Sequence, residues 1–343
     1  MHLIVIVLLI LFAAPVTTAQ DASASPERHA MERAAAYSAQ HRGQTMLVMY
    51  DGTLVFEQYS NGGDANRLQM LASGTKSFVG VLAAAAVEDG LLKLDDPVSN
   101  SIPSWKDDPE KATITYRHLL TLTSGLKASE KGLAAEQPAW ADSAAAPMTG
   151  KPGEQFNYGA NQLSVFAYAL EQSLDTETFE EYLERRILKP LDISIEWRIK
   201  CKDGHPQVGG GAFIKSRDWA TFGEFVRLQG RRGEKRIVNG DLIADCFVGT
   251  KQNPAYGQTW WLKNDVTPEL RKKITILSLE WADVANSDWV PHDLVAAVGA
   301  GKQRLYVIPS HKLVIVRQAG FPGREFSDCE FLSLLIRGQS LSE

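Results

Sequence analysis

The sequence predicts an α+β fold in which one antiparallel sheet is built from both ends of the chain. Two stretches with strand character, residues 45–59 and 304–316, lie near opposite termini. Between them, from about residue 73 to 200, the apolar spacing is mainly helical. The simplest arrangement is a continuous sheet flanked by helices, with a helical subdomain inserted at 73–200. We expect residues 29–343 to form this single domain.

The N-terminal half is expected to contain a helix, a β-hairpin and then a series of helices. A helix is expected over 27–41, and strands over 45–50 and 53–59 join at Asp51-Gly52, a dipeptide that favours a two-residue hairpin turn. Residues 77–89 are rich in Ala, Val and Leu and are closed by Gly90, which predicts a helix. Shorter helices are expected at 115–123, 162–173 and 178–188.

In the C-terminal half, strand character returns near 209–214 and a helix is expected over 216–229. Residues 304–308 and 313–316 flank Pro309-Ser310-His311-Lys312, which predicts a second hairpin. A closing helix is expected over 326–337.

Composition excludes some function classes. The 343 residues are 44% hydrophobic and 22% charged, as in ordinary folded soluble proteins, and the formal charge is −5. No basic surface supports nucleic-acid binding. The three cysteines, Cys201, Cys246 and Cys329, allow one disulfide with a spare thiol or three buried thiols. Neither they nor the seven histidines have metal-ligand spacing, so we expect no metal.

The N-terminus has the pattern of a signal peptide. Residues 3–16 are almost unbroken aliphatic, too short to span a bilayer comfortably, and Thr17-Thr18-Ala19 gives a small-residue end. We therefore expect a signal peptide at 1–19, a disordered leader at 20–28 and export to the periplasm or medium. The first residues lack Lys and Arg, so an uncleaved segment that holds the protein at the membrane is the alternative. No stable membrane span is expected after cleavage.

Ser73 and Lys76 form the most informative pattern. They lie three residues apart at the start of the expected helix, so both side chains share one helix face. The Lys76 amine can then reach the Ser73 oxygen, and the positive end of the helix dipole favours negative charge there. This arrangement is suited to acyl transfer by a serine nucleophile.

The chain resembles the serine β-lactamase and penicillin-binding-protein superfamily, nearest its class C, esterase and 6-aminohexanoate-dimer-hydrolase-like branch. The resemblance covers roughly residues 40–337 and implies the β-lactamase/transpeptidase-like fold. Several sequence blocks in order carry it: 71–76, 88–98, 114–126, 152–158, 209–211 before 217–219, and Tyr256-Gly257 before Trp260-Trp261.

The resemblance implies roles for further residues. Tyr158 matches the tyrosine that faces the nucleophile and relays its proton. Family members often read Tyr-Ser-Asn, whereas this chain reads Tyr158-Gly159-Ala160-Asn161, so Asn161 is a substrate-binding candidate displaced by one position.

The family's third motif is a strand triad that begins with Lys or His and ends in Gly. It matches Ala297-Val298-Gly299 here, so the usual basic residue is replaced by Ala297. That replacement disfavours substrates with a free carboxylate, unless Lys302 or His292 substitutes. Gly299 fits a strand that approaches the substrate closely. The N–H groups of Ser73 and Ala300 would form the oxyanion hole.

The resemblance therefore implies an exported serine hydrolase that acts on a small ester, amide or peptide through an acyl-enzyme. Lys76 or Tyr158 could be the base that activates Ser73. No cofactor is needed, and we expect a monomer. A β-lactamase or D-Ala-D-Ala carboxypeptidase is one alternative. A non-catalytic relative that binds a ligand in the same pocket is the other.

Overall fold

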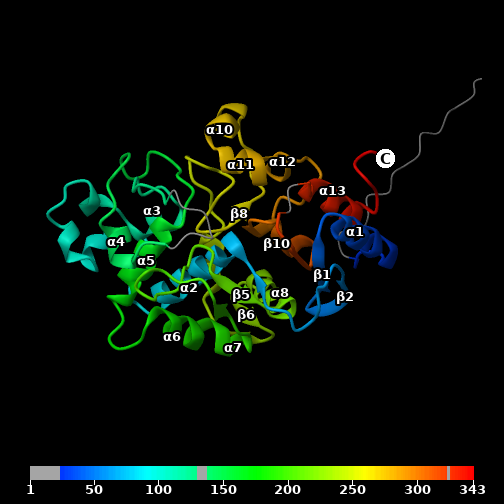
Figure 1. Cartoon of the computed structure of the whole chain (residues 1–343), viewed down its shortest axis with the longest axis horizontal. Helices are drawn as coiled ribbons and strands as arrows, with labels where there is room; N and C mark the ends of the chain where they lie inside the picture. The colour runs from blue at the N-terminus through cyan, green and yellow to red at the C-terminus, as the bar shows by residue number, and fades with distance from the viewer. Residues whose placement is uncertain (1–23, 130–136, 323–324) are drawn as a thin grey trace, which may run out of the picture.

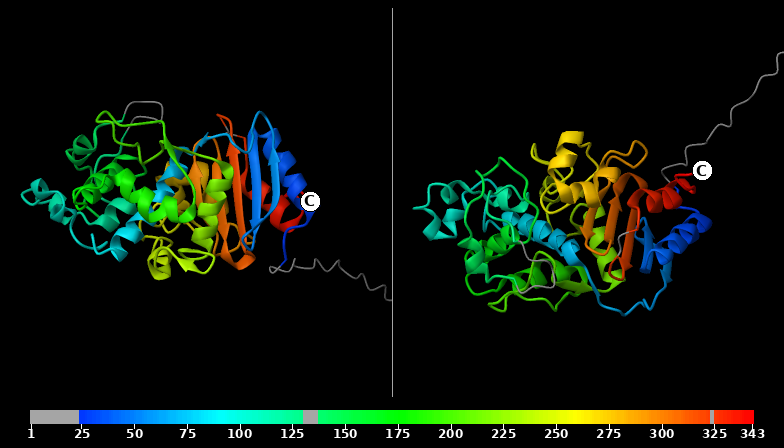
Figure 2. Two further views of the ribbon diagram at one scale, coloured as in Figure 1. Left: turned by 90° about the horizontal axis from the view of Figure 1, so that it is seen from below. Right: turned by 45° about the horizontal axis from the view of Figure 1, so that its top comes forward.

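The sheet joins the two ends of the chain. The computed structural model describes residues 24–129, 137–322 and 325–343. Within these ranges, six strands form one antiparallel sheet in the order β2-β1-β11-β10-β9-β8. Figure 2 shows the N-terminal strands, in blue, beside the C-terminal strands, in orange. The predicted α+β fold with a sheet built from both termini is confirmed.

The two predicted hairpins form as expected. Asp51 and Gly52 both have positive φ, 48° and 79°, which matches the twist of a two-residue hairpin turn. β1 pairs along its length with β11, from Gly43 opposite Ala319 to Tyr50 opposite Leu313. The main sheet consists of β1 (Gly43–Tyr50), β2 (Thr53–Tyr59), β8 (Trp261–Leu262), β9 (Val295–Gly299), β10 (Gln303–Ile308) and β11 (Leu313–Ala319).

Helices cover both faces of the sheet. α8 (Ser216–Arg227) packs on β1, β10 and β11. α1 (Arg28–Gln40) packs on β1 and contacts α13 (Asp328–Leu332) and the π-helical turn that follows it, Ser333–Arg337. Because both faces are covered, every residue of β10 and β11 is buried. The hydrophobic runs 305–308 and 313–316 within these strands reflect this double burial.

The helical part of the chain lies to one side of the sheet, in cyan and green in Figure 1. At its centre is α2 (Lys76–Glu88), which is buried from residue 76 to 86. The expected helix at 178–188 is two segments, α6 (Phe179–Leu183) and a π-helical turn, Glu184–Leu188. Around α2 lie α3 (Tyr116–Leu120), α4 (Trp140–Ala144), α5 (Asn161–Glu171) and α7 (Lys189–Leu191).

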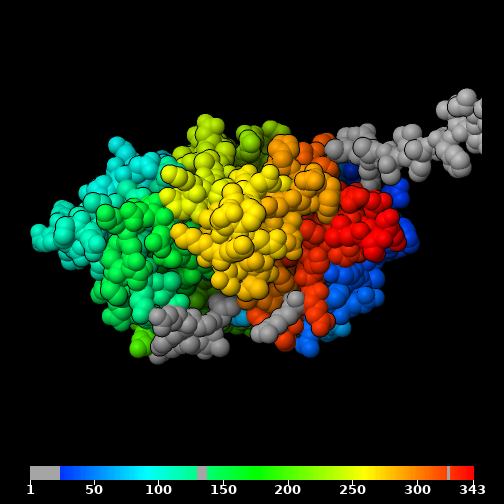
Figure 3. Space-filling model, turned by 90° about the horizontal axis from the view of Figure 1, so that it is seen from above, coloured from blue at the N-terminus to red at the C-terminus, as the bar shows by residue number. Residues whose placement is uncertain are grey.

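Several short elements were not expected from the sequence. α10 (Pro268–Lys273), α11 (Thr275–Glu280) and α12 (Ala282–Ala285) form the yellow-to-orange surface in the middle of Figure 3. The strand expected near 209–214 forms as β5 (Ala212–Ile214). The other short strands and helix that were not expected are β3 (Gln69–Met70), β4 (Glu196–Trp197), β6 (Arg231–Arg232), β7 (Lys235–Arg236) and α9 (Gly240–Asp245).

The N-terminal predictions fall largely outside the structure. The expected signal peptide, 1–19, and residues 20–23 of the expected leader are not among the described residues. Arg28, the last residue of that leader, is the first residue of α1. Among the helices that the structure describes, none is both long enough and apolar enough to cross a bilayer.

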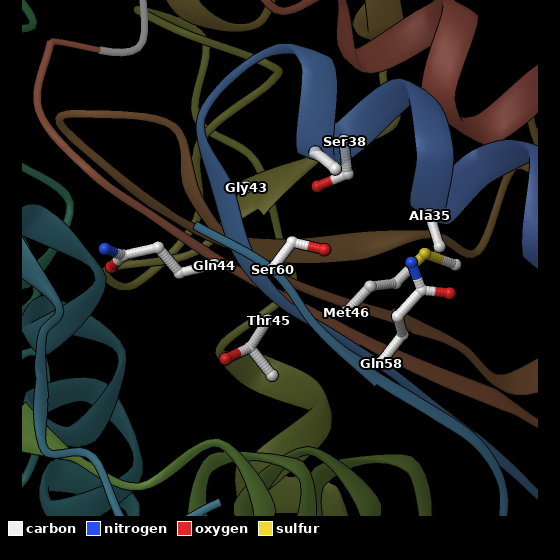
Figure 4. Close-up of a pocket in the computed structure, with 9 residues that line it drawn as sticks. Ala35, Ser38, Gly43, Gln44, Thr45, Met46, Gln58 and Ser60 are labelled. Carbon is white, nitrogen blue, oxygen red and sulfur yellow. The ribbon is translucent and has the colours of Figure 1, made fainter. Parts of the chain in front are cut away.

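A small hollow lies between α1 and the first hairpin. Figure 4 shows Ser38 pointing toward it from α1, with Thr45 and Met46 on β1 and Gln58 on β2. Its volume of about 10 Å³ is room for about one water molecule. It is therefore too small to be a substrate site.

Candidate active site

Ser73 lies in a tight turn that leads directly into the central helix. The turn, η1 (Ala72–Thr75), follows β3, and α2 begins at Lys76. Ala72 has φ +48°, a left-handed conformation that L-residues rarely adopt. The backbone N–H of Leu71 is held by the carbonyl of Ala212 in β5. These constraints turn the chain sharply just before Ser73, which is half-buried.

Lys76 is placed as the sequence predicted. Its Nζ lies 3.0 Å from Ser73 Oγ and 2.5 Å from the carbonyl oxygen of Gly209. Its side chain is buried, and no carboxylate of the described ranges forms an ion pair with it. Burial lowers the pKa of Lys76 to about 7. At neutral pH a large share of this amine is therefore unprotonated and able to accept the Ser73 proton.

Tyr158 lies beside both Ser73 and Lys76. Its side chain interacts with those of Ser73 and Trp261, and its ring centroid is 4.9 Å from Lys76 Nζ and 5.7 Å from the Trp261 ring centroid. Burial raises the pKa of Tyr158 to about 12, so the phenol stays protonated at neutral pH. The structure thus brings Ser73, Lys76 and Tyr158 into mutual contact.

Position 209 has no room for a side chain, so it requires glycine. A Cβ on this residue would lie 2.4 Å from Cβ of Ala160 and 3.7 Å from Lys76 Nζ. Ala160 therefore occupies the position beside Lys76 and Gly209. The Asn161 amide instead donates to the carbonyl oxygens of Lys127, at 3.0 Å, and Ser143, at 3.5 Å. The place of Asn161 in the substrate-binding set stays a prediction.

The end of β9 packs directly on the turn that carries Ser73. A Cβ on Gly299 would lie 2.0 Å from the Leu71 carbonyl oxygen and 3.1 Å from the Gly74 backbone nitrogen. Ala300 follows at the exposed end of the strand. Within the described ranges, neither Ser73 N–H nor Ala300 N–H has a hydrogen-bond acceptor. Both N–H groups are therefore available to bind an oxyanion.

Position 297, where the third motif would have a Lys or His, is apolar in this chain. Ala297 is buried in β9, opposite Leu305 of β10. Lys302 is ion-paired with Glu280, at 3.1 Å, and with Asp328, at 3.8 Å. It therefore does not serve as a free cation for the site. His292 is exposed before β9.

The close packing of Gly299 makes a testable prediction. Gly299→Ala should push β9 away from η1 and reduce ester or amide turnover by at least about tenfold, because misplacement by about 1 Å can cost about 10²-fold. Gly150→Ala is the matched control, since a Cβ there has no neighbour closer than 3.9 Å. Thermal unfolding and kcat/KM of both variants would check this. Equal activity of the two variants would contradict the close packing.

Comparison with known proteins identifies the chain. Residues 27–319 match the Beta-lactamase family. The chain belongs to the beta-lactamase family. An uncharacterized protein of Alkalihalophilus pseudofirmus is 24% identical over 298 residues, which cover 80% of this chain and 83% of that protein. Protein flp of Staphylococcus aureus (strain COL) is 29% identical over 133 residues, 36% of this chain and 26% of flp.

Several solved structures share the fold. A putative beta-lactamase from Bacteroides dorei superposes with a TM-score of 0.72 at 15% identity, covering 91% of this chain and 100% of that one. EstCE1, a hydrolase with promiscuous acyltransferase activity, gives 0.67 at 18% identity, covering 91% and 98%. A D-stereospecific amidohydrolase from Streptomyces gives 0.65 at 16% identity, covering 92% and 100%. These likenesses show a shared fold, and the family match over residues 27–319 makes the chain a serine hydrolase of the beta-lactamase family.

Two contacts of this beta-lactamase-family site were missed from the sequence. The Gly209 carbonyl accepts a hydrogen bond from Lys76, and the Trp261 ring packs against the Tyr158 ring with centroids 5.7 Å apart. The glycine run at 209–211 was a visible signal, because consecutive glycines allow backbone to approach a side chain closely. The role of Trp261 had no such local signal.

The structure shows whether the three cysteines form a disulfide. Cys201, Cys246 and Cys329 are all free thiols, so the disulfide alternative is wrong. Cys201 and Cys246 are buried and Cys329 is half-buried. Burial raises the pKa of the Cys201 thiol to about 11, so it is protonated and unreactive at neutral pH.

Proposed function

We propose that the protein is an exported serine hydrolase that cleaves a small ester or amide, including a small peptide, through an acyl-enzyme on Ser73. One observation carries the proposal: the buried Lys76 amine lies 3.0 Å from Ser73 Oγ, and burial lowers its pKa to about 7. A general base works best when its pKa lies near the operating pH. Export and a monomeric state, both expected from the sequence, remain part of this proposal.

Acylation begins with neutral Lys76. It accepts the Ser73 hydroxyl proton while Oγ attacks the substrate carbonyl carbon. The oxyanion binds the N–H groups of Ser73 and Ala300. The hydroxyl of Tyr158, whose side chain interacts with that of Ser73, donates its proton to the leaving oxygen or nitrogen and recovers one from Lys76. With its pKa raised to about 12, Tyr158 suits the role of proton donor better than that of first base.

Deacylation repeats these steps with water. Lys76, through Tyr158, accepts a proton from the attacking water, and the returning proton restores the Ser73 hydroxyl as the acid product leaves. Every proton that leaves a residue returns to one within the cycle. The chain's own residues supply each group that these steps use.

The substrate class is argued from the site and the structural neighbours. Ala297 leaves the third motif without a cation, and Lys302 is paired with Glu280 and Asp328. A substrate whose recognition depends on a free carboxylate therefore lacks its usual partner. Two structural neighbours, an amidohydrolase and a hydrolase with promiscuous acyltransferase activity, support ester or amide chemistry.

The proposal is tested by labelling the mature protein. We expect a fluorophosphonate to add to Ser73, and benzylpenicillin to give no adduct, as read by intact mass and peptide mapping. Adducts from both reagents would restore the penicillin-recognising alternative despite Ala297. No adduct from either would contradict the enzyme and favour a ligand-binding relative.

The oxyanion hole can be tested at Ala300. Ala300→Pro removes one N–H donor and should lower kcat about 10²- to 10³-fold, the loss typical of a single oxyanion donor. Ala300→Ser keeps the N–H, and its side chain would be exposed, so its kcat should stay within about twofold of wild type. Steady-state kinetics with a chromogenic ester such as p-nitrophenyl butyrate would measure both. Similar kcat values for Ala300→Pro and Ala300→Ser would exclude Ala300 as a donor.

A further inference from the structure

A buried arginine binds the peptide group that carries the proposed oxyanion donor. Arg304 Nη1 donates to the carbonyl oxygen of Gly299 at 3.0 Å. That carbonyl and the N–H of Ala300 belong to one peptide unit. The only cis peptide among the described residues joins Phe321 and Pro322, so the Gly299–Ala300 peptide is trans. Its N–H therefore points away from Arg304.

The guanidinium of Arg304 is fixed by its partners. Arg304 is fully buried. Its Nε and Nη2 bind the two oxygens of Asp328 at 2.6 and 3.1 Å, and Nη2 also lies 2.9 Å from Glu280. Asp328 in turn accepts a hydrogen bond from Tyr306 at 2.7 Å. Nη1 is thus held at the Gly299 carbonyl, with its other contact to the carbonyl of its neighbour Gln303.

We propose that Arg304 is a positioning residue that strengthens the Ala300 N–H as an oxyanion donor. A hydrogen bond from a charged donor draws electron density toward the Gly299 carbonyl oxygen. The amide nitrogen gives up density to it, and the N–H becomes more positive, which is how hydrogen bonds in a chain reinforce one another. The effect persists in a buried site, where water does not screen it. This inference rests on the proposed acyl-enzyme function.

The chain offers a matched control in Arg317. It is also fully buried, and it stands directly opposite Arg304 in the pairing of β10 with β11. Its guanidinium donates to the carbonyls of Lys302 and His41 and to Ser38 Oγ, and it does not contact Gly299. Replacing Arg317 disturbs the same sheet without touching the proposed oxyanion peptide.

The kinetic test compares Arg304→Lys with Arg317→Lys. Lysine keeps the charge beside Asp328, but its single ammonium lacks the fork that reaches Gly299 at the same time. With p-nitrophenyl butyrate we expect kcat of Arg304→Lys to fall about tenfold at nearly constant KM, a smaller loss than removal of a whole donor. Arg317→Lys should lower the unfolding temperature while kcat stays within about twofold. Equal losses of kcat in the two variants would overturn the proposal.

A spectroscopic readout separates polarisation from general destabilisation. In the acyl-enzyme formed from carbonyl-labelled p-nitrophenyl butyrate, a weaker oxyanion donor raises the infrared stretching frequency of the acyl carbonyl. We expect a rise in Arg304→Lys and none in Arg317→Lys. An unchanged frequency in Arg304→Lys, with normal Ser73 acylation in the wild type, would overturn the role of Arg304 alone. Absence of any Ser73 acylation in the wild type would overturn the proposed function and this inference together.

A second variant keeps the test decisive if Arg304→Lys does not fold. Glu280→Gln removes a charge from Arg304 at a side chain that is partly exposed, and it leaves the bond to Gly299 in place. With less of its charge neutralised, Arg304 polarises the peptide at least as strongly. The acyl carbonyl frequency should therefore stay the same or fall. A rise in Glu280→Gln would overturn the proposal.

Discussion

Replacing Ser73 by alanine is expected to abolish turnover, lowering kcat by about 10⁴-fold or more, the scale seen when a nucleophile is lost. The Lys76 amine lies 3.0 Å from Ser73 Oγ, so this substitution removes the hydroxyl that the amine is placed to activate. Ser73 is only half-buried, so the unfolding temperature should change by no more than a few degrees. Ester hydrolysis, fluorophosphonate labelling and thermal unfolding would measure the three effects.

Ser77→Ala is the matched control for this substitution. Ser77 lies one turn further along α2, and its hydroxyl donates to the Gly74 carbonyl at 2.7 Å. Its loss should cost about 1 kcal/mol of stability while labelling of Ser73 is retained. Turnover by Ser73→Ala close to that of wild type would disprove the assignment of the nucleophile.

Replacing Lys76 by methionine is expected to abolish activity and to make the protein more stable near pH 7. Lys76 in the folded protein has a pKa of about 7, against 10.5 for a lysine in water. The unfolded chain therefore binds more protons between pH 7 and 10.5, and wild-type stability rises with pH across that window. At pH 7 the penalty is about 4 kcal/mol. After loss of two hydrogen bonds of about 1 kcal/mol each, Lys76→Met should gain about 2 kcal/mol.

The same titration should appear in catalysis. Since the neutral amine is the base, wild-type kcat/KM should rise as pH increases through about 7. Denaturant unfolding at several pH values should show the stability advantage of Lys76→Met shrinking toward pH 10.5. Lys93→Met, at an exposed lysine, should leave both profiles unchanged. A Lys76→Met variant that retains the rise in kcat/KM would show that another group is the base.

Sequence patterns were sufficient where the determinants are local. Asp51-Gly52 specifies its own turn, and the spacing of Ser73 and Lys76 places both on one helix face. Contacts between distant segments were less accessible. Gly209 lies 133 residues after Lys76 in the sequence, and no local pattern at either residue predicts their hydrogen bond.

The short elements between β8 and β9 were also missed. α10, α11 and α12 are only four to six residues long, too short for helical periodicity to be read with confidence from apolar spacing. Their position depends instead on long-range contacts, such as the ion pair of Glu280 in α11 with Arg304 in β10. The loss of the basic residue at position 297, by contrast, could be predicted from the sequence, because the third motif begins with Ala297 and not with Lys or His.

The pairing of β1 with β11 affects when the protein can fold during its synthesis. β1 can pair with β2 early, but Gly43 meets Ala319 of β11, so nearly the whole chain must leave the ribosome before β1 finds its second neighbour. Contacts so distant in sequence make folding slow. Ser73 is synthesised early, whereas Ala300 arrives late. A nascent chain therefore carries its reactive serine without the second oxyanion donor, and hydrolytic activity belongs only to the finished molecule.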